Sequence, residues 1–177
     1  MKIKKTKFKD LLIIKQINNK DNRGNLRETF NFKLLKKKFI FEYCTTSKKN
    51  VLRGFHFQTR LKQSKYVNVV KGKILDVVVD LRKNSNTFGK SFKIILSKKN
   101  ALGLFIPAGF AHAYYSLDKE NIIYYKLDNY YAPKFENGII YNDKDIKISW
   151  PKKKIIVSKK DRNLHTFDQF KRKFKGL

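Results

Sequence analysis

The feature that most constrains the fold is a series of short apolar runs rich in β-branched and aromatic residues. These runs follow one another about every ten residues and are separated by turn-forming residues, which is typical of an all-β sandwich or barrel. They predict strands at residues 39–45, 51–57, 65–70, 73–80, 91–96, 103–106, 112–117 and 121–129. The sequence therefore predicts an antiparallel β protein with few short helices.

The run from Ile74 to Val79 is almost continuously apolar, which predicts a central strand covered on both faces. Lys71-Gly72, directly before it, is the best candidate for a hairpin turn, because glycine can adopt a positive φ. Helical spacing occurs only at 28–38 and in the tail. The tail stripe predicts core packing or a dimer contact, and consists of Leu164, Phe167, Phe170 and Phe174.

The chain has 177 residues, which is the length of one domain, and we expect a single domain over 1–177. Its one cysteine, Cys44, cannot form an internal disulfide, which favours a reducing cytoplasm. The apolar stretch near the N-terminus, Leu11 to Ile14, is far too short for a signal peptide or a membrane span.

The formal net charge is +28, which ordinarily indicates a nucleic acid or an anionic membrane as partner. Most of the basic residues are lysines, however, and phosphate and base recognition favours arginine. The lysine clusters are scattered between apolar runs, at 36–38, 48–49, 98–99, 152–154 and 159–160. We interpret the charge as a solvated surface produced by compositional bias and predict no nucleic-acid or membrane partner. Polyanion binding stays open as the alternative.

One of the three histidines, His56, lies within the strand-like segment R-G-F-H-F-Q at 53–58. Side chains alternate along a strand, so Arg53 is expected to share a face with residues 55 and 57. His56 and Gln58 are expected on the other face. One of these faces would line the interior of a barrel.

The segment from Pro107 to His112 has the form P-x-G-x-x-H and resembles the second sequence motif of the cupin superfamily. The first cupin motif normally supplies imidazole and carboxylate ligands to a metal. Here the matching positions hold His56, Gln58 and Gln63, and neutral amides are poor ligands. We therefore predict no metal, and His56 is free to carry a proton.

A closer resemblance runs in order from about residue 21 to residue 168. The motifs that carry it are VLRGFHFQ at 51–58, QSKYV at 63–67, GKILDVVVDLR at 72–82, SNTFG at 85–89, IPAGFAH at 106–112, YKLDNYYAP at 125–133 and ISWP at 148–151. Together they resemble the dTDP-4-dehydrorhamnose 3,5-epimerase family. The resemblance implies a cupin-type jelly-roll barrel, a nucleotide-sugar substrate, no cofactor and a homodimer paired through its N-terminal region.

The resemblance also implies a role for four residues. His56 would be the general base, and Asp161 would orient its imidazole. Tyr125 would be the general acid on the opposite face of the sugar. Lys65 would face the C4 oxygen, where charge develops as the enolate forms. The family's substrate contacts correspond to Arg23, Glu28, Arg53, His112, Tyr131, Glu136 and Lys160.

The chain departs from the family pattern before its VLRGFHFQ strand. Phe41 and Tyr43 stand where the family usually has Gln and Asn, and Asn25-Leu26-Arg27 replaces a commonly aromatic stretch. These changes alter the pocket and leave the proton-transfer residues in place. A single-position epimerase or another nucleotide sugar therefore stays open, beside a non-catalytic cupin that binds polyanions.

Overall fold

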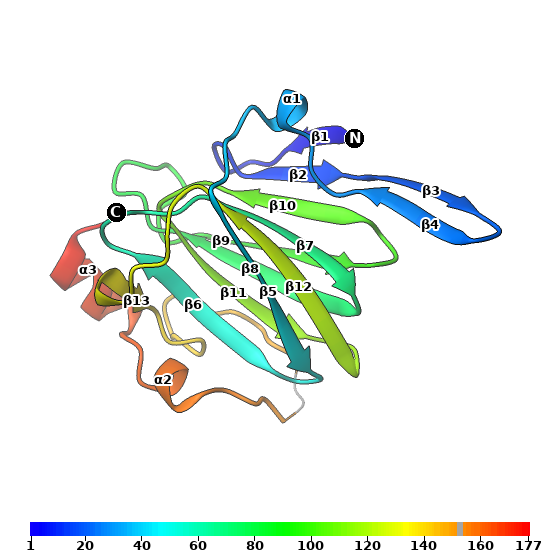
Figure 1. The fold of residues 1–177 in the computed structure, drawn as a ribbon. Helices are drawn as coiled ribbons and strands as arrows, with labels where there is room; N and C mark the ends of the chain where they lie inside the picture. Colours follow the sequence, from blue (N-terminus) through cyan, green and yellow to red (C-terminus); the bar gives the residue numbers. More distant parts are fainter. Residues whose placement is uncertain (152–153) are drawn as a thin grey trace.

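The structure, a computed structural model, describes residues 1–151 and 154–177 and consists mainly of two antiparallel sheets (Figure 1). The larger sheet has the strand order β1-β2-β10-β7-β12-β5. Its strands are β1 (Lys2–Lys5), β2 (Leu12–Lys15), β5 (Phe41–Lys48), β7 (Lys65–Lys71), β10 (Leu102–Ile106) and β12 (Glu120–Leu127). The predicted antiparallel β architecture is confirmed.

The second sheet has five strands in the order β13-β6-β11-β8-β9. They are β6 (Leu52–Gln58), β8 (Lys73–Asp80), β9 (Ser91–Ser97), β11 (Phe110–Ser116) and β13 (Glu136–Gly138). Each of the eight strands predicted from the sequence forms within a few residues of its expected bounds. The short strand β13 and the N-terminal strands were not predicted, because they lack long β-branched runs.

The turn at Lys71-Gly72 forms as predicted, with Gly72 at φ +80°, but it is not a hairpin turn. It connects β7 in one sheet to β8 in the other, so the two strands it joins are not paired. A Cβ on Gly72 would lie 2.4 Å from the carbonyl oxygen of Glu120, so no residue with a side chain fits at this position. The hairpin interpretation was wrong because local turn chemistry does not specify whether the chain pairs with itself or crosses between sheets.

The central strand β8 is covered on both faces, as predicted. Ile74 and Val78 belong to the core cluster between the sheets, with side chains from β7, β10 and β12. Val77 and Val79 point the other way, into a cluster covered by the C-terminal segment. Because side chains alternate between the two faces of a strand, β8 contributes apolar side chains to two cores.

The helices are short: α1 (Phe32–Leu35), α2 (Lys159–Arg162), α3 (Phe167–Phe174) and the 3₁₀ turn η1 (Pro133–Phe135). The stripe in the tail forms α3, where Phe170 is fully buried and its ring meets Phe57 edge-on at 5.4 Å. Thr166 and Gln169 form a capping box at its start. Core packing of the tail is thus confirmed, whereas the spacing at 28–38 yields only the single turn α1.

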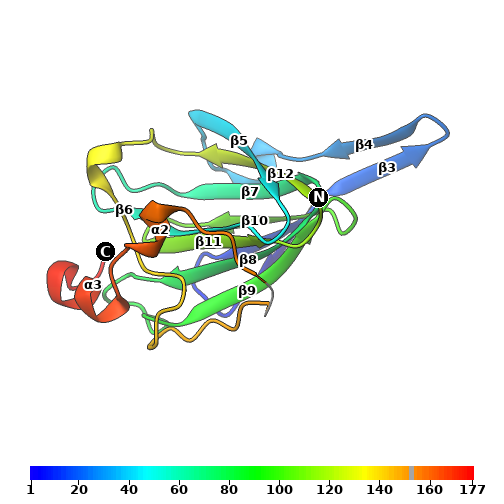
Figure 2. The ribbon, with the colours of Figure 1, turned by 90° about the horizontal axis from the view of Figure 1, so that it is seen from below.

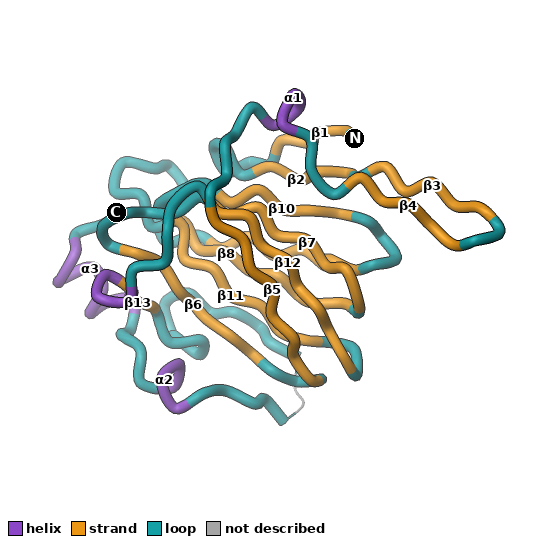
Figure 3. The backbone as a smooth tube through the Cα atoms, in the orientation of Figure 1, coloured by secondary structure: helices purple, strands orange, loops and turns teal. Residues whose placement is uncertain are grey.

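A two-stranded hairpin of β3 (Ile17–Asp21) and β4 (Gly24–Glu28) projects from the larger sheet, as Figures 1 and 2 show. Leu26 on this hairpin is 71 % exposed, so its apolar side chain has no cover within the chain. In Figure 3 the hairpin extends beyond the end of β10, away from β6 and β13.

None of the helices formed by the described residues is long and apolar enough to cross a membrane. Of the basic cluster at 152–154, residues 152 and 153 lie outside the described residues.

Candidate active site

Strand β6 carries a bulge that determines which of its side chains reach the interior. His56 pairs with His112 of β11 while Arg53 pairs with Tyr114, so three steps on β6 match two on β11. Gly54 lies inside the bulge at φ +117°, and a Cβ there would lie 2.5 Å from the carbonyl oxygen of His112.

The bulge corrects the prediction made from strict alternation. Arg53 lies on the cavity side with His56, and both line the same hollow. Phe55 and Phe57 remain together in the opposite core, as predicted. The extra residue of the bulge inverts the alternation between Arg53 and Phe55.

His56 is paired with Asp161, which lies on α2 beside β6. His56 Nε2 lies 2.8 Å from Asp161 Oδ1, and Asp161 Oδ2 accepts a hydrogen bond from Gly54 N at 3.1 Å. Burial pushes the pKa of Asp161 upward, but the hydrogen bonds from His56 and Gly54 outweigh it and hold that pKa below its usual value. Asp161 is therefore a carboxylate that contacts the imidazole and can stabilise its protonated form.

Lys65 is the first residue of β7 and lines the same hollow as His56. Burial lowers the pKa of Lys65 to about 8, against the attraction of Glu136 and Asp76. Among the described residues no carboxylate forms an ion pair with its ammonium group. The group is therefore a poorly solvated cation that can stabilise a developing oxyanion.

Tyr125 on β12 is 3 % exposed and also lines this hollow. Burial raises its pKa well above the usual value, and nearby Tyr114, Tyr43 and Asp76 add to this rise. The phenol therefore stays protonated and can donate a proton. In the part of the chain that the structure describes, no residue occupies its hydroxyl by a hydrogen bond.

A second histidine–carboxylate pair lies beside the first. His112 Nε2 is 2.8 Å from Asp76 Oδ2, and both residues are buried. Asp76 Oδ1 is buried without a hydrogen-bond partner among the described residues. The His112 ring meets Tyr125 edge-on, with centroids 6.0 Å apart.

Three further predicted residues form a group at the mouth of the site. Glu136 of β13 accepts a hydrogen bond from the Tyr131 hydroxyl at 2.6 Å and forms an ion pair with Lys160. Burial opposes ionisation of Glu136, yet the contacts from Lys160 and Tyr131 keep its pKa below the usual value. The group is fixed and polar, and it adjoins His56.

Three adjoining hollows of about 170, 70 and 470 Å³ make up the site, and His56 lines all of them. The structure brings together nine of the predicted residues: His56, Lys65, Tyr125, Asp161, Arg53, His112, Tyr131, Glu136 and Lys160. The site therefore unites side chains from both sheets and from α2.

Arg23 and Glu28 are not brought to this cavity within one chain. Arg23 is at the tip of the projecting hairpin, where its side chain is 85 % exposed and pairs with Asp21 at 2.7 Å. Glu28 ends β4 and accepts a hydrogen bond from Asn31 at 2.7 Å. Their role in substrate binding stays a prediction.

Apart from noting that Tyr43 alters the pocket, sequence reasoning assigned no role to several cavity residues. Tyr43 and Thr45 of β5 and Tyr114 of β11 line the hollow, and the Tyr114 hydroxyl lies 3.0 Å from Thr45 Oγ1. Asp76 on β8 holds the ring of His112 through the contact described above. The one available signal for Asp76 was a carboxylate inside an otherwise apolar strand, which needs a buried partner.

The residues at the cupin metal-ligand positions are engaged elsewhere. Gln58 Nε2 donates to the carbonyl of Leu61 at 2.7 Å, and Gln63 Nε2 donates to the carbonyl of Asn129 at 3.0 Å. Among the residues that the structure describes, no group of three or more His, Cys, Asp or Glu side chains could hold a metal ion.

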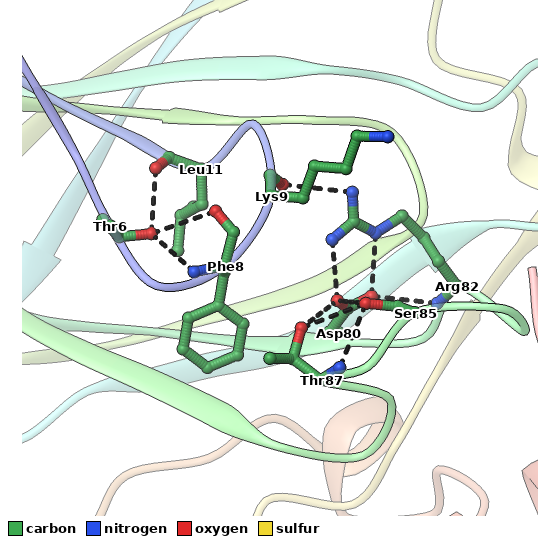
Figure 4. Close-up of polar contacts among 8 residues, drawn as sticks. All are labelled: Thr6, Phe8, Lys9, Leu11, Asp80, Arg82, Ser85 and Thr87. Atoms are coloured by element: carbon green, nitrogen blue, oxygen red, sulfur yellow. Dashed lines mark hydrogen bonds and ion pairs between the residues drawn. The ribbon is translucent and has the colours of Figure 1, made fainter.

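A separate cavity of about 690 Å³ is lined by residues of the β1–β2, β6–β7, β8–β9 and β10–β11 connections. Figure 4 shows why these loops are fixed: Asp80 accepts hydrogen bonds from Arg82, Ser85 and Thr87, and Arg82 Nη1 donates to Lys9 O at 3.1 Å. The residues that line it include four lysines but no histidine, carboxylate or tyrosine. It therefore differs from the cavity around His56, which histidine, glutamate and tyrosine side chains line.

The sequence model of the dTDP-4-dehydrorhamnose 3,5-epimerase family matches residues 5–169. The chain belongs to this family. An epimerase of that name from Methanothermobacter thermautotrophicus is 41 % identical over 167 residues, which cover 90 % of each chain. These matches confirm the resemblance drawn from the motifs.

Solved structures of the epimerase family have the same fold. The Legionella pneumophila dTDP-6-deoxy-D-glucose-3,5-epimerase, in complex with dTDP-4-keto-L-rhamnose, is 36 % identical with a TM-score of 0.90, covering 94 % of this chain and 93 % of that one. A 3'-monoepimerase from Streptomyces bikiniensis, in complex with dTDP-quinovose, is 26 % identical with a TM-score of 0.89, covering 94 % and 88 %. The cupin-type fold predicted for the chain is thereby confirmed.

Proposed function

We propose that this chain inverts C3 and C5 of dTDP-4-dehydro-6-deoxy-D-glucose to give dTDP-4-dehydro-L-rhamnose, with no cofactor. The observation that carries the proposal is that His56, which is paired with Asp161, lines one hollow together with Tyr125 and Lys65. A general base, a general acid and an oxyanion partner are the three groups that inversion beside a ketone needs. The names of the relatives support the same substrate.

The first half of each inversion is proton removal. The C4 ketone acidifies the hydrogens at C3 and C5, and His56 takes one of them while the C–H electron pair moves into an enolate. The negative charge on the C4 oxygen would lie against the ammonium of Lys65. Because that ammonium is poorly solvated, its attraction for the enolate is stronger than in water.

The second half is proton delivery from the opposite face. Tyr125 donates its phenolic proton to the same carbon, which collapses the enolate to the ketone with inverted configuration. The phenolate and the imidazolium that remain then return to their starting states by proton exchange with solvent. No electron is transferred to another molecule, so no redox cofactor is required.

Deuterium exchange tests the proposal directly. The wild-type protein, incubated with the dTDP-sugar in D₂O, is expected to incorporate deuterium at both C3 and C5, as measured by NMR and mass spectrometry. Absence of incorporation at both positions would refute the proposal. Incorporation at one position alone would select a single-position epimerase, an alternative that the monoepimerase from Streptomyces bikiniensis and the altered residues Phe41 and Tyr43 keep open.

The proposal includes a homodimer in which Arg23 and Glu28 of each chain contact substrate bound to the other. The projecting hairpin with its exposed Leu26 supports this arrangement, because apolar side chains on a thin two-stranded arm need a partner surface. Light scattering should give twice the chain mass. Mixing inactive Arg23→Ala and His56→Ala proteins should restore partial activity if each site uses both chains, and no recovery would count against shared sites.

Polyanion binding is the competing function, motivated by the net charge of +28. It predicts tight association with DNA or RNA that weakens steeply with salt and survives loss of His56. The epimerase proposal predicts at most weak, nonspecific association. Filter binding at several salt concentrations separates the two.

A further inference from the structure

The general acid proposed for this site has an unusual neighbour on the edge strand β5. Tyr43 is directly opposite Tyr125 of β12 in the strand register. The two rings stack with centroids 4.7 Å apart and planes inclined by 21°. Tyr43 also lines two of the three hollows that meet at His56. The stacked pair is therefore part of the wall of the catalytic cavity.

The hydroxyl of a general acid must remain free to reach its substrate, so hydrogen bonds cannot anchor it. Among the described residues none holds the Tyr125 hydroxyl in this way. What holds Tyr125 is contact with its ring: Tyr43 covers one side and the His112 ring meets it edge-on. The position of the reacting oxygen is thus determined by aromatic packing.

Tyr43 is itself held in place. Phe41, two residues earlier on β5, packs against it with centroids 5.7 Å apart, and Tyr130 continues the row at 6.1 Å from Phe41. Burial raises the pKa of Tyr43 to about 12, so its ring stays neutral over the working pH range. A neutral, supported ring can restrain Tyr125 without competing for protons.

We infer that Tyr43 is a positioning residue, which holds the ring of Tyr125 so that its hydroxyl meets the face of the sugar opposite His56. The inference rests on the proposed function and deepens it. The family usually has Asn at this position, and an amide cannot form this aromatic stack. In this chain the position therefore supports the general acid in a way that Asn could not.

The consequence concerns proton delivery rather than proton removal. The stack joins Tyr43 to Tyr125 and involves neither the imidazole of His56 nor the ammonium of Lys65, so a variant that loses the ring should still form the enolate. A small displacement of a reacting group lowers rates strongly, because the reacting atoms no longer start from an aligned geometry. Misplaced Tyr125 should let solvent return the proton from the side of His56, which gives exchange without inversion.

The test compares Tyr43→Leu, which keeps apolar volume but removes the stack, with Tyr43→Phe, which keeps the stack but removes the hydroxyl. The matched control is Tyr124→Ala, on the same strand as Tyr125 but with its hydroxyl donated to Glu42. For each protein, kcat, KM and the ratio of deuterium exchange to inversion are measured in D₂O. Far-UV circular dichroism checks folding, and Tyr43→Asn serves as a second stack-free variant.

We expect Tyr43→Leu and Tyr43→Asn to lower kcat about tenfold with KM changed less than about threefold. In both, the ratio of exchange to inversion should rise, whereas Tyr43→Phe and Tyr124→Ala stay close to wild type. If the wild type is active and the stack-free variants show an unchanged ratio of exchange to inversion, the inference about Tyr43 is overturned while the proposed function stands. Equal damage in Tyr43→Phe would also overturn it, because the hydroxyl would then matter. A wild type without any exchange would refute the proposed function itself.

Discussion

The neighbouring strands β6 and β11 each carry a histidine that is paired with a carboxylate. The two nitrogen–oxygen distances are equal, but one histidine is open to the cavity and the other is buried. His56 and His112 are directly paired in register, and each has one ring nitrogen 2.8 Å from a carboxylate oxygen. The His56 side chain is 28 % exposed at the cavity, whereas that of His112 is 5 % exposed. Pair geometry alone therefore does not make a catalytic base, because a base must also be open to its substrate.

The carboxylates of the two pairs also differ, in how many of their oxygens have a hydrogen-bond partner. Asp161 has both oxygens engaged, one by His56 and one by the Gly54 amide. Asp76 has one oxygen on His112 and one without a partner among the described residues. The first pair is a fully hydrogen-bonded unit suited to repeated changes of charge. The second provides a buried charge beside Lys65 and Tyr125.

The largest effect should come from removing the open histidine. His56→Ala is expected to lower kcat by about 10³-fold or more and to abolish deuterium exchange at both carbons, since His56 is the histidine of the two pairs that is open to the cavity. Steady-state kinetics and NMR in D₂O measure this. If exchange is retained, the base would be His112, and exposure to the cavity would not distinguish the two histidines.

The next effect concerns the support of that base. Asp161→Asn is expected to lower kcat by about 10²-fold with little change in KM, because an amide does not stabilise the imidazolium that forms. Stopped assays over a range of substrate concentrations separate the two constants. A change in KM alone would instead assign Asp161 to substrate binding.

A smaller effect should follow from pH. Because burial lowers the pKa of Lys65 to about 8, its ammonium is lost as pH rises through that value. The charge that stabilises the enolate is present below about pH 8, so kcat/KM should fall about tenfold for each pH unit above it. Profiles of the wild type and of Lys65→Arg measure this, and the arginine variant should lack that alkaline decline. An identical decline in both would assign it to another group.

The smallest effect should come from the closed pair. Asp76 raises the pKa of Lys65, so Asp76→Asn should move the alkaline decline of kcat/KM to lower pH while leaving deuterium exchange detectable. It should also lower the free energy of unfolding by about 1–3 kcal/mol, because His112 loses a charged hydrogen-bond partner. Urea titration measures the stability. Loss of all exchange in a folded variant would show that the two pairs are equivalent.

Much of the site could be predicted because motifs identify residue types in order along the chain. His56, Lys65, Tyr125 and Asp161 were assigned in this way. The structure brings the first three to one hollow and places Asp161 against His56. The bulge at Gly54 could not be predicted, because alternation assumes an unbroken ladder and a single extra residue reverses it. For this reason Arg53 was expected on the wrong face.

The sequence by itself determined the β architecture, since period-two runs of β-branched and aromatic residues are compatible with few other folds. It also determined the family, because several motifs occur along the chain in the same order as in the family. Only the tertiary structure decided that the Gly72 turn crosses between sheets, that Asp76 pairs with His112, and that Tyr43 stacks on Tyr125. Such contacts depend on how two sheets and a C-terminal segment close around one cavity, and local sequence preferences carry no information about that closure.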